Sequence, residues 1–76
     1  MISTYEIRAM ALKDHLNDDN DYGRYHRELS RLSLDVSAHL KRCVKAGDDC
    51  NELRDLLDYV DGEMFVAGQM REQEVA

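Results

Sequence analysis

Residues 22–47 have the sequence YGRYHRELSRLSLDVSAHLKRCVKAG, in which apolar side chains recur in steps of three and four. The recurring residues are Tyr22, Tyr25, Leu29, Leu32, Val36, Leu40 and Cys43 with Val44. Such steps place side chains on one face of an α-helix, and glycine, here Gly47, commonly follows the C-terminus of a helix. The stretch therefore predicts one long helix over residues 22–46 with a single apolar face.

A second helix is predicted before this stretch. Ser3-Thr4-Tyr5-Glu6 has the capping-box pattern, in which a hydroxyl and a carboxylate each accept a hydrogen bond from a backbone N–H at the start of a helix. We expect this helix to begin at Ser3 and to span about residues 4–16. Residues 17–21, Asn-Asp-Asp-Asn-Asp, favour a turn or a helix cap over a helix interior.

A third helix is predicted over about residues 50–71. Asp49-Cys50-Asn51-Glu52 is an acidic analogue of the capping box. Gly62 is a point at which the helix could end, but the apolar period continues beyond it at Met64, Ala67 and Met70. We therefore expect the helix to continue past this glycine, with the last few residues of the chain frayed.

The fold class follows from these helices. Proline, which breaks helices, is absent from the chain, and no segment shows the sustained polar–apolar alternation of a strand. Because short connections make successive helices antiparallel neighbours, we predict a single all-α domain over residues 1–76. We expect an antiparallel three-helix bundle in which the second and third helices form a long hairpin. The predicted core consists of Leu29, Leu32, Val36, Leu40, Leu53, Leu56, Leu57 and Val60.

The chain is small for a domain that folds alone. It has 76 residues, of which 43% are hydrophobic, and a domain of this size buries only about 60% of the surface that its unfolded chain exposes. A second copy or a partner protein is therefore an expected source of further stability. No apolar run approaches the ~20 residues of a membrane span, and no signal-peptide pattern stands at the start. We expect a cytoplasmic protein, away from membranes, with reduced cysteines.

Some apolar residues do not fit a single core. The first predicted helix is apolar on two sides, since one stripe runs from Tyr5 to Leu16 and a second contains Ile7 and Met10. A three-helix bundle has no central position for such a helix. Scattered surface hydrophobes are one explanation, but we favour a homodimer interface or a partner interface. We predict that this contact uses Ile7, Met10, Ala11, Leu34, Phe65 and Val66.

Charge is segregated along the chain. Residues 22–47 carry six Lys and Arg against two acidic residues, a net charge of +4, and residues 48–76 carry nine acidic residues against two basic ones, a net charge of −7. Helices of opposite charge indicate surfaces that recognise charged partners. The predicted basic face consists of Arg24, Arg27, Arg31, Arg42 and Lys45. The predicted acidic face consists of Asp48, Glu52, Asp55 and Asp58.

No motif indicates a reaction, a cofactor or a strong metal site. The serines of residues 30–37 lie inside a predicted helix, without the strained turn of a nucleophile elbow, and the four glycines form no phosphate-binding loop. His39 and Cys43 are four residues apart and Cys50 follows the turn, a weak zinc pattern that lacks a C-x-x-C knuckle and needs a carboxylate or water as its fourth ligand. We predict buried structural thiols, with zinc binding and a Cys43–Cys50 disulfide as alternatives.

We therefore expect a non-enzymatic interaction protein, a regulator, adaptor or inhibitor that forms a homodimer and docks helix surfaces onto a larger protein. Two alternatives stay open. The basic face of the second helix suits nucleic acid, although the net charge of −6 opposes such binding overall. The acidic face of the third helix suits mimicry of nucleic-acid phosphates, which would block a DNA- or RNA-binding protein.

Overall fold

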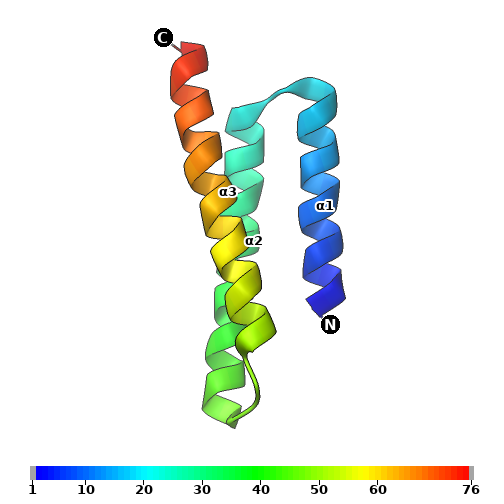
Figure 1. Cartoon of the computed structure of the whole chain (residues 1–76), viewed down its shortest axis with the longest axis vertical. Coiled ribbons are helices and arrows are strands. Elements are labelled where there is room, and N and C mark those ends of the chain that lie inside the picture. Colours follow the sequence, from blue (N-terminus) through cyan, green and yellow to red (C-terminus); the bar gives the residue numbers. More distant parts are fainter. Residues whose placement is uncertain (1, 76) are drawn as a thin grey trace.

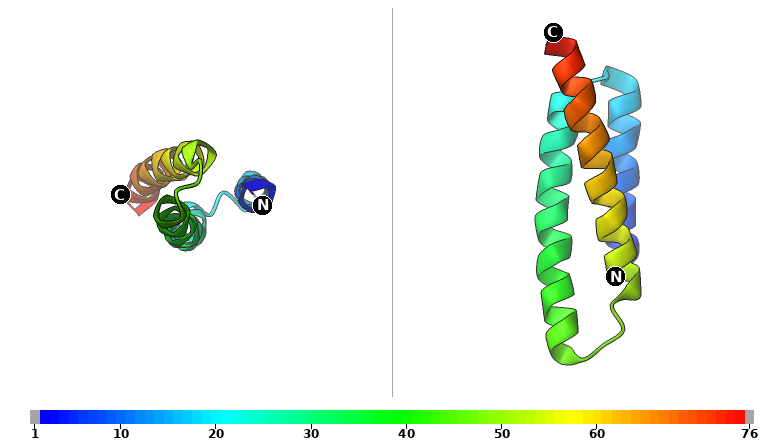
Figure 2. Two further views of the ribbon diagram at one scale, coloured as in Figure 1. Left: turned by 90° about the horizontal axis from the view of Figure 1, so that it is seen from below. Right: turned by 60° about the vertical axis from the view of Figure 1, so that its left-hand side comes forward.

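The computed structural model describes the backbone of residues 2–75 and the side chains of residues 4–72. It contains three helices, α1 (Ile2–Asp19), α2 (Tyr22–Ala46) and α3 (Asn51–Val75), and no strand within residues 2–75. The predicted all-α class and the three helices are confirmed. Figures 1 and 2 show α2 and α3 side by side over most of their length, with α1 standing further off and joined to α2 by residues 20–21.

The helices form an elongated molecule of 46 × 20 × 15 Å. The interface between α2 and α3 is the most extensive, and α1 packs more against α2 than against α3. Within residues 2–75, none of the helices combines the length and the apolar character needed to cross a membrane.

The ends of α2 are set by residues that satisfy its free backbone groups. At the start, the Arg24 N–H donates to Asp21 Oδ1 at 3.0 Å, which is the role of an N-cap carboxylate. At the end, Gly47 has a φ of 76°, and the Gly47 N–H donates to the Val44 carbonyl at 3.1 Å. Because a Cβ disfavours positive φ, glycine at position 47 allows the chain to leave the helix there.

α1 is longer at both ends than the sequence predicted. It begins at Ile2, so Ser3 is a helical residue and its predicted role as the N-cap is wrong. It continues to Asp19, and the predicted turn over residues 17–21 is reduced to two residues. Asn20 ends the helix with a φ of 53°, a left-handed conformation that asparagine adopts at helix ends more readily than most residues.

α3 begins one residue later and ends four residues later than predicted, since it continues past Gly62 to Val75. The Asn51 N–H donates to the Asp49 carboxylate at 3.0 Å, so Asp49 supports the first turn of the helix. The glycine at position 62 does not interrupt the helix, and the expectation that α3 continues past it is confirmed.

The core lies mainly between α2 and α3. The largest fully buried side chains are Leu29, Leu32, Val36 and Val60. Leu53 and Leu56 are also buried, whereas Leu40 and Leu57, which we predicted as core residues, are only half-buried and pack against its edge. Four further buried residues complete the cluster: Ala9, Leu16, Tyr25 and Ala67. Fully burying one leucine-sized side chain stabilises the fold by about 1.5–3 kcal/mol.

Candidate interaction surface

All three helices leave large apolar side chains exposed. The exposed fraction is 65% for Ile7, 67% for Met10, 71% for Leu34 and 68% for Phe65. About half of the side chain is exposed at Val44, Tyr59 and Val66. The two apolar stripes of α1 therefore differ: Ala9 and Leu16 are buried, whereas the stripe of Ile7, Met10 and Ala11 faces away from the core.

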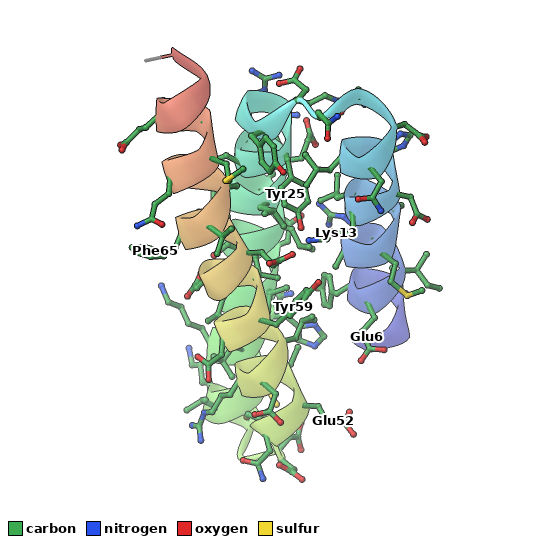
Figure 3. All side chains as sticks on the ribbon, turned by 45° about the horizontal axis from the view of Figure 1, so that its top comes forward. Glu6, Lys13, Tyr25, Glu52, Tyr59 and Phe65 are labelled. Carbon is green, nitrogen blue, oxygen red and sulfur yellow. The ribbon has the colours of Figure 1, made fainter. Side chains whose placement is uncertain are left out.

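Met10 and Tyr59 border a hollow between α1 and α3, which we call the α1–α3 groove. Its volume is about 350 Å³, and its lining residues are Glu6, Ala9, Met10, Asp55, Leu56 and Tyr59. Figure 3 shows Tyr59 projecting from α3 into the space between α3 and α1. Ala9 and Leu56 are buried and form an apolar floor, whereas the side chains of Glu6 and Asp55 are exposed. The groove is therefore an open apolar surface with carboxylates beside it.

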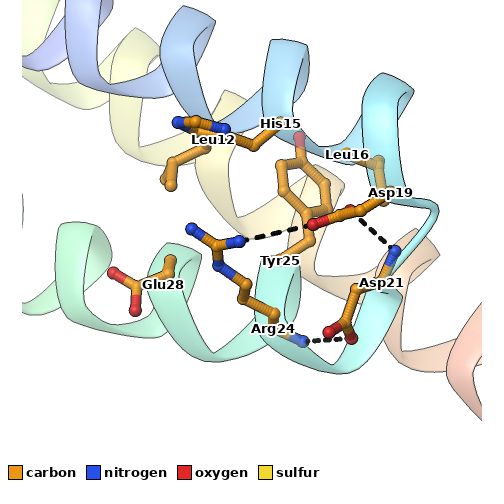
Figure 4. Close-up of a pocket in the computed structure, with 8 residues that line it drawn as sticks. All are labelled: Leu12, His15, Leu16, Asp19, Asp21, Arg24, Tyr25 and Glu28. Atoms are coloured by element: carbon orange, nitrogen blue, oxygen red, sulfur yellow. Dashed lines mark hydrogen bonds and ion pairs between the residues drawn. The ribbon is translucent and has the colours of Figure 1, made fainter.

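The opposite side of α1 is more polar. A second open groove, of about 300 Å³, separates α1 from α2 and is lined by Arg8, Ala11, Leu12, His15, Arg24 and Glu28. Beside it lies the small cavity of Figure 4, where Arg24 pairs with Asp19 at 3.3 Å above the buried Leu16 and Tyr25. This cavity has a volume of about 10 Å³, which is room for about one water molecule, so it does not hold a larger ligand.

The six predicted contact residues do not lie on one surface. Met10 borders the α1–α3 groove, and its neighbour Ala11 borders the groove between α1 and α2. Figure 3 shows Phe65 on the side of α3 that points away from α1. Tyr59, which is not among the contact residues predicted from the sequence, joins Met10 at the groove. Its position three residues after Leu56 placed it beside the core face of α3, but the packing of α1 was needed to show what it borders.

The residues of the predicted basic and acidic faces are all exposed. On the basic face, Arg24 pairs with Asp19 at 3.3 Å and Arg31 pairs with Glu28 at 3.2 Å. Arg27, Arg42 and Lys45 make no ion pair with any side chain of residues 4–72. Over the same residues, no basic side chain of α2 pairs with an acidic side chain of α3. Much of the basic charge is therefore directed to solvent.

Glu63 joins the three helices through one carboxylate oxygen. Lys13 Nζ of α1 and the Tyr25 hydroxyl of α2 both donate to Glu63 Oε1, each at 2.9 Å. The hydrogen bond from Lys13 lowers the pKa of Glu63, and the same bond raises the pKa of Lys13. Burial raises the pKa of Tyr25, and the hydrogen bond to Glu63 raises it further. This cluster holds α1 in place one helical turn along α3 from Tyr59.

The residues weighed as a zinc site separate into two groups. The Tyr5 hydroxyl lies within hydrogen-bond distance of His39 Nδ1, at 3.1 Å, and the two rings meet edge to face with centroids 5.7 Å apart. Cys43 and Cys50 lie together, with their Sγ atoms 2.9 Å apart, and both are free thiols. Cys50 is buried as predicted, whereas Cys43 is only half-buried. In the part of the chain that the structure describes, no group of three or more His, Cys, Asp or Glu side chains could hold a metal ion.

Comparison of the chain with protein-family models, with curated proteins and with solved structures finds no significant match in any of the three. The structure itself presents two exposed surfaces with apolar side chains. These are the apolar α1–α3 groove with its carboxylates, and the exposed face of α2 on which Leu34 lies among basic side chains.

Proposed function

We propose that this chain is a non-enzymatic interaction protein that self-associates and docks helix surfaces onto a larger protein. The observation that supports the proposal best is the α1–α3 groove, where two exposed apolar side chains, Met10 and Tyr59, flank a buried apolar floor. Exposed apolar surface rimmed by polar groups is typical of sites that contact other macromolecules. The arrangement that we propose for the acting protein is an antiparallel three-helix bundle with this groove on one side.

The partner that suits the groove is a helix face that presents an apolar side chain among basic ones. The carboxylates of Glu6 and Asp55 attract positive charge and repel an acidic partner. A second copy of the chain supplies such a face, because Leu34 of α2 is 71% exposed. Arg31 and Arg27 precede Leu34 by three and seven residues, spacings that place all three on one side of the helix. We propose that Leu34 of one copy inserts between Met10 and Tyr59 of the other.

The small size of this contact indicates weak association. Each apolar side chain of this size that becomes fully buried contributes about 1.5–3 kcal/mol, whereas bringing two molecules together costs about 4–15 kcal/mol. Three such side chains, at the favourable end of both ranges, therefore give about −5 kcal/mol, which is a Kd of roughly 0.2 mM. The interaction is sensitive to salt, because its charged groups lie at the solvent-exposed edge of the groove.

The proposal is tested by sedimentation velocity over a range of concentrations that spans this Kd. Met10→Glu and Phe65→Glu form a matched pair, because the two side chains are equally exposed, at 67% and 68%, but only Met10 borders the groove. We expect the unmodified chain and Phe65→Glu to form dimers at high concentration and Met10→Glu to stay monomeric. A chain that stays monomeric throughout would exclude self-association, and a loss caused by Phe65→Glu alone would exclude the groove.

Direct binding of nucleic acid by α2 is a second candidate function. It is favoured by the exposure of Arg27, Arg42 and Lys45, which make no ion pair with the described side chains. If these residues contact phosphates, Arg27→Ala and Arg42→Ala each weaken binding to nucleic acid of any sequence. Each also reduces the slope of log K against log salt concentration by about 1. Gel shifts at several salt concentrations measure both quantities, and the absence of binding at low salt would exclude this function.

A further inference from the structure

Two thiols meet where α2 ends and α3 begins. Cys43 lies in the last turn of α2, and Cys50 directly precedes the first residue of α3. Their Sγ atoms are 2.9 Å apart, and neither thiol is bonded to another sulfur. Residues 1–76 contain two cysteines, so within these residues each thiol has one possible partner.

The turn between the helices holds the two thiols in place. The backbone N–H of Asp48 donates to the Cys43 carbonyl at 3.1 Å, and the Arg54 N–H donates to the Cys50 carbonyl at 3.0 Å. Both cysteines are therefore tied into the hydrogen bonding of a helix end, and Cys50 is also buried, with 6% of its surface exposed. The pair stays close without any rearrangement of the chain.

Joining the two sulfur atoms requires only a small movement. A disulfide has an S–S length of about 2.05 Å, so the two Sγ atoms, now 2.9 Å apart, must approach by roughly 1 Å. The reduced thiols also contact two carbonyls, Cys50 Sγ that of Asp48 at 3.1 Å and Cys43 Sγ that of Asp49 at 3.5 Å. Because Asp48 and Asp49 are exposed, water replaces the thiol hydrogen bonds after oxidation.

We infer that Cys43 and Cys50 form a redox-sensitive site that a low-molecular-weight disulfide oxidises to an internal disulfide. The thiolate of Cys43, the more exposed of the two, attacks one sulfur of the oxidant, forms a mixed disulfide and releases one thiolate. Cys50 then loses its proton to solvent, attacks the Cys43 sulfur and displaces the second thiolate. Two protein thiols thereby become one S–S bond, and the oxidant becomes two thiols.

The electrostatics of the pair make this exchange slow at neutral pH. The hydrogen bond with Cys50 raises the pKa of Cys43 to about 11, so only a small fraction of Cys43 is thiolate, which is the attacking species. The rate therefore increases with pH toward that value. Once formed, the bond ties the acidic start of α3 to the end of α2 and restricts the unfolded chain. This role is independent of self-association, and either can fail without the other.

The experiment incubates the reduced 76-residue chain with oxidised glutathione at mildly alkaline pH and then digests it with trypsin without reduction. Cleavage after Arg42, Lys45 and Arg54 releases two peptides, residues 43–45 and 46–54, and an internal disulfide links them. We expect the linked peptides in a chain of monomer mass, and a Tm higher by roughly 10 °C. Dithiothreitol should reverse both changes.

The control is Cys50→Ser, which leaves Cys43 without an internal partner. It should retain glutathione on Cys43 and show no rise in Tm. If the unmodified chain instead accumulates glutathione on Cys43, or links to a second chain, the inference is wrong. An internal disulfide that leaves the Tm unchanged would equally contradict it. The peptide map of the unmodified chain decides the question even if Cys50→Ser does not fold.

Discussion

Leu32 and Leu34 lie two positions apart in α2 and occupy opposite environments. Leu32 is fully buried, whereas Leu34 is 71% exposed, because two residues turn an α-helix through roughly half a circle. Leu32→Ala should reduce the free energy of unfolding by about 2–5 kcal/mol, and Leu34→Ala should change it by less than about 0.5 kcal/mol. Urea denaturation of both variants measures these values. Equal losses would mean that the face of α2 assigned to the core is wrong.

Glu63 makes the stability depend on pH in both directions. Its pKa is lowered from 4.5 in the folded chain, chiefly by Lys13. The stabilisation that the Glu63 carboxylate contributes to the fold is therefore complete above pH 4.5 and is lost as the pH falls through the folded-state pKa. The pKa of Lys13 is raised from 10.5, chiefly by Glu63. The stabilisation that the charged Lys13 contributes is therefore present below pH 10.5 and is lost as the pH rises through the folded-state pKa. The pair therefore stabilises the fold between these limits.

Glu63→Gln tests this pH dependence. The substitution removes the charge that Lys13 and Tyr25 contact, and it should cost about 0.5–1.5 kcal/mol at neutral pH, a modest value because Lys13 is partly exposed and its charge is screened. It should also flatten the loss of stability at acidic pH. Asp55→Asn, at an exposed carboxylate without an ion pair among residues 4–72, is the control. Thermal unfolding at several pH values from acidic to neutral measures the effect. If the Tm of Glu63→Gln and that of the unmodified chain depend on pH with the same slope, this prediction is contradicted.

At the scale of helices, Gly47 and Gly62 should respond to alanine with opposite signs. Gly47 ends α2 with a φ of 76°, and a Cβ in that conformation costs about 1–2 kcal/mol. Gly62 lies inside α3, where nothing within 4 Å would meet an added Cβ, so alanine should stabilise the helix by about 0.5–1 kcal/mol. Denaturation midpoints of the two variants show the signs directly. A shift of both in the same direction would contradict the assigned helix ends.

The helices themselves could be predicted because apolar period is a property of each segment alone. The end of α2 at Gly47 could also be predicted from the local sequence, because glycine commonly follows the C-terminus of a helix. The C-terminal end of α1 was predicted less well. Asn17 and Asp18 have low helix propensity, which favours an earlier end. In the structure the helix continues through both residues to Asp19, and Asn20 then takes a positive φ. Packing also separated Leu53, which is buried, from Leu57, which is half-buried, although both fit the same apolar period.

At the scale of the whole molecule, the exposure of single residues could be predicted from the sequence, whereas their grouping on one surface could not. The surplus apolar residues of α1 and the charged faces were visible from spacing. Their grouping depends on how α1 is rotated against α2 and α3, which periodicity within one helix does not specify. For this reason the adjacent residues Met10 and Ala11 border different grooves, and Tyr59 became part of the candidate site only in the structure.

In the dimer that we propose, Leu34 of one copy inserts beside Met10 of the other. Leu34→Glu places a carboxylate on the inserting face, and Met10→Glu places one at the groove, where Glu6 and Asp55 already lie. Each variant alone should therefore fail to associate. Leu34→Glu keeps an intact groove, however, and Met10→Glu keeps an intact face on α2, so an equimolar mixture still contains one complementary pair of surfaces.

The most direct measurement is sedimentation velocity of the two variants, alone and mixed, at a concentration where the unmodified chain is dimeric. We predict monomers for each variant alone and a dimer, weaker than that of the unmodified chain, for the mixture. A mixture that stays monomeric, or a variant that associates as well alone as the unmodified chain does, would contradict the claim.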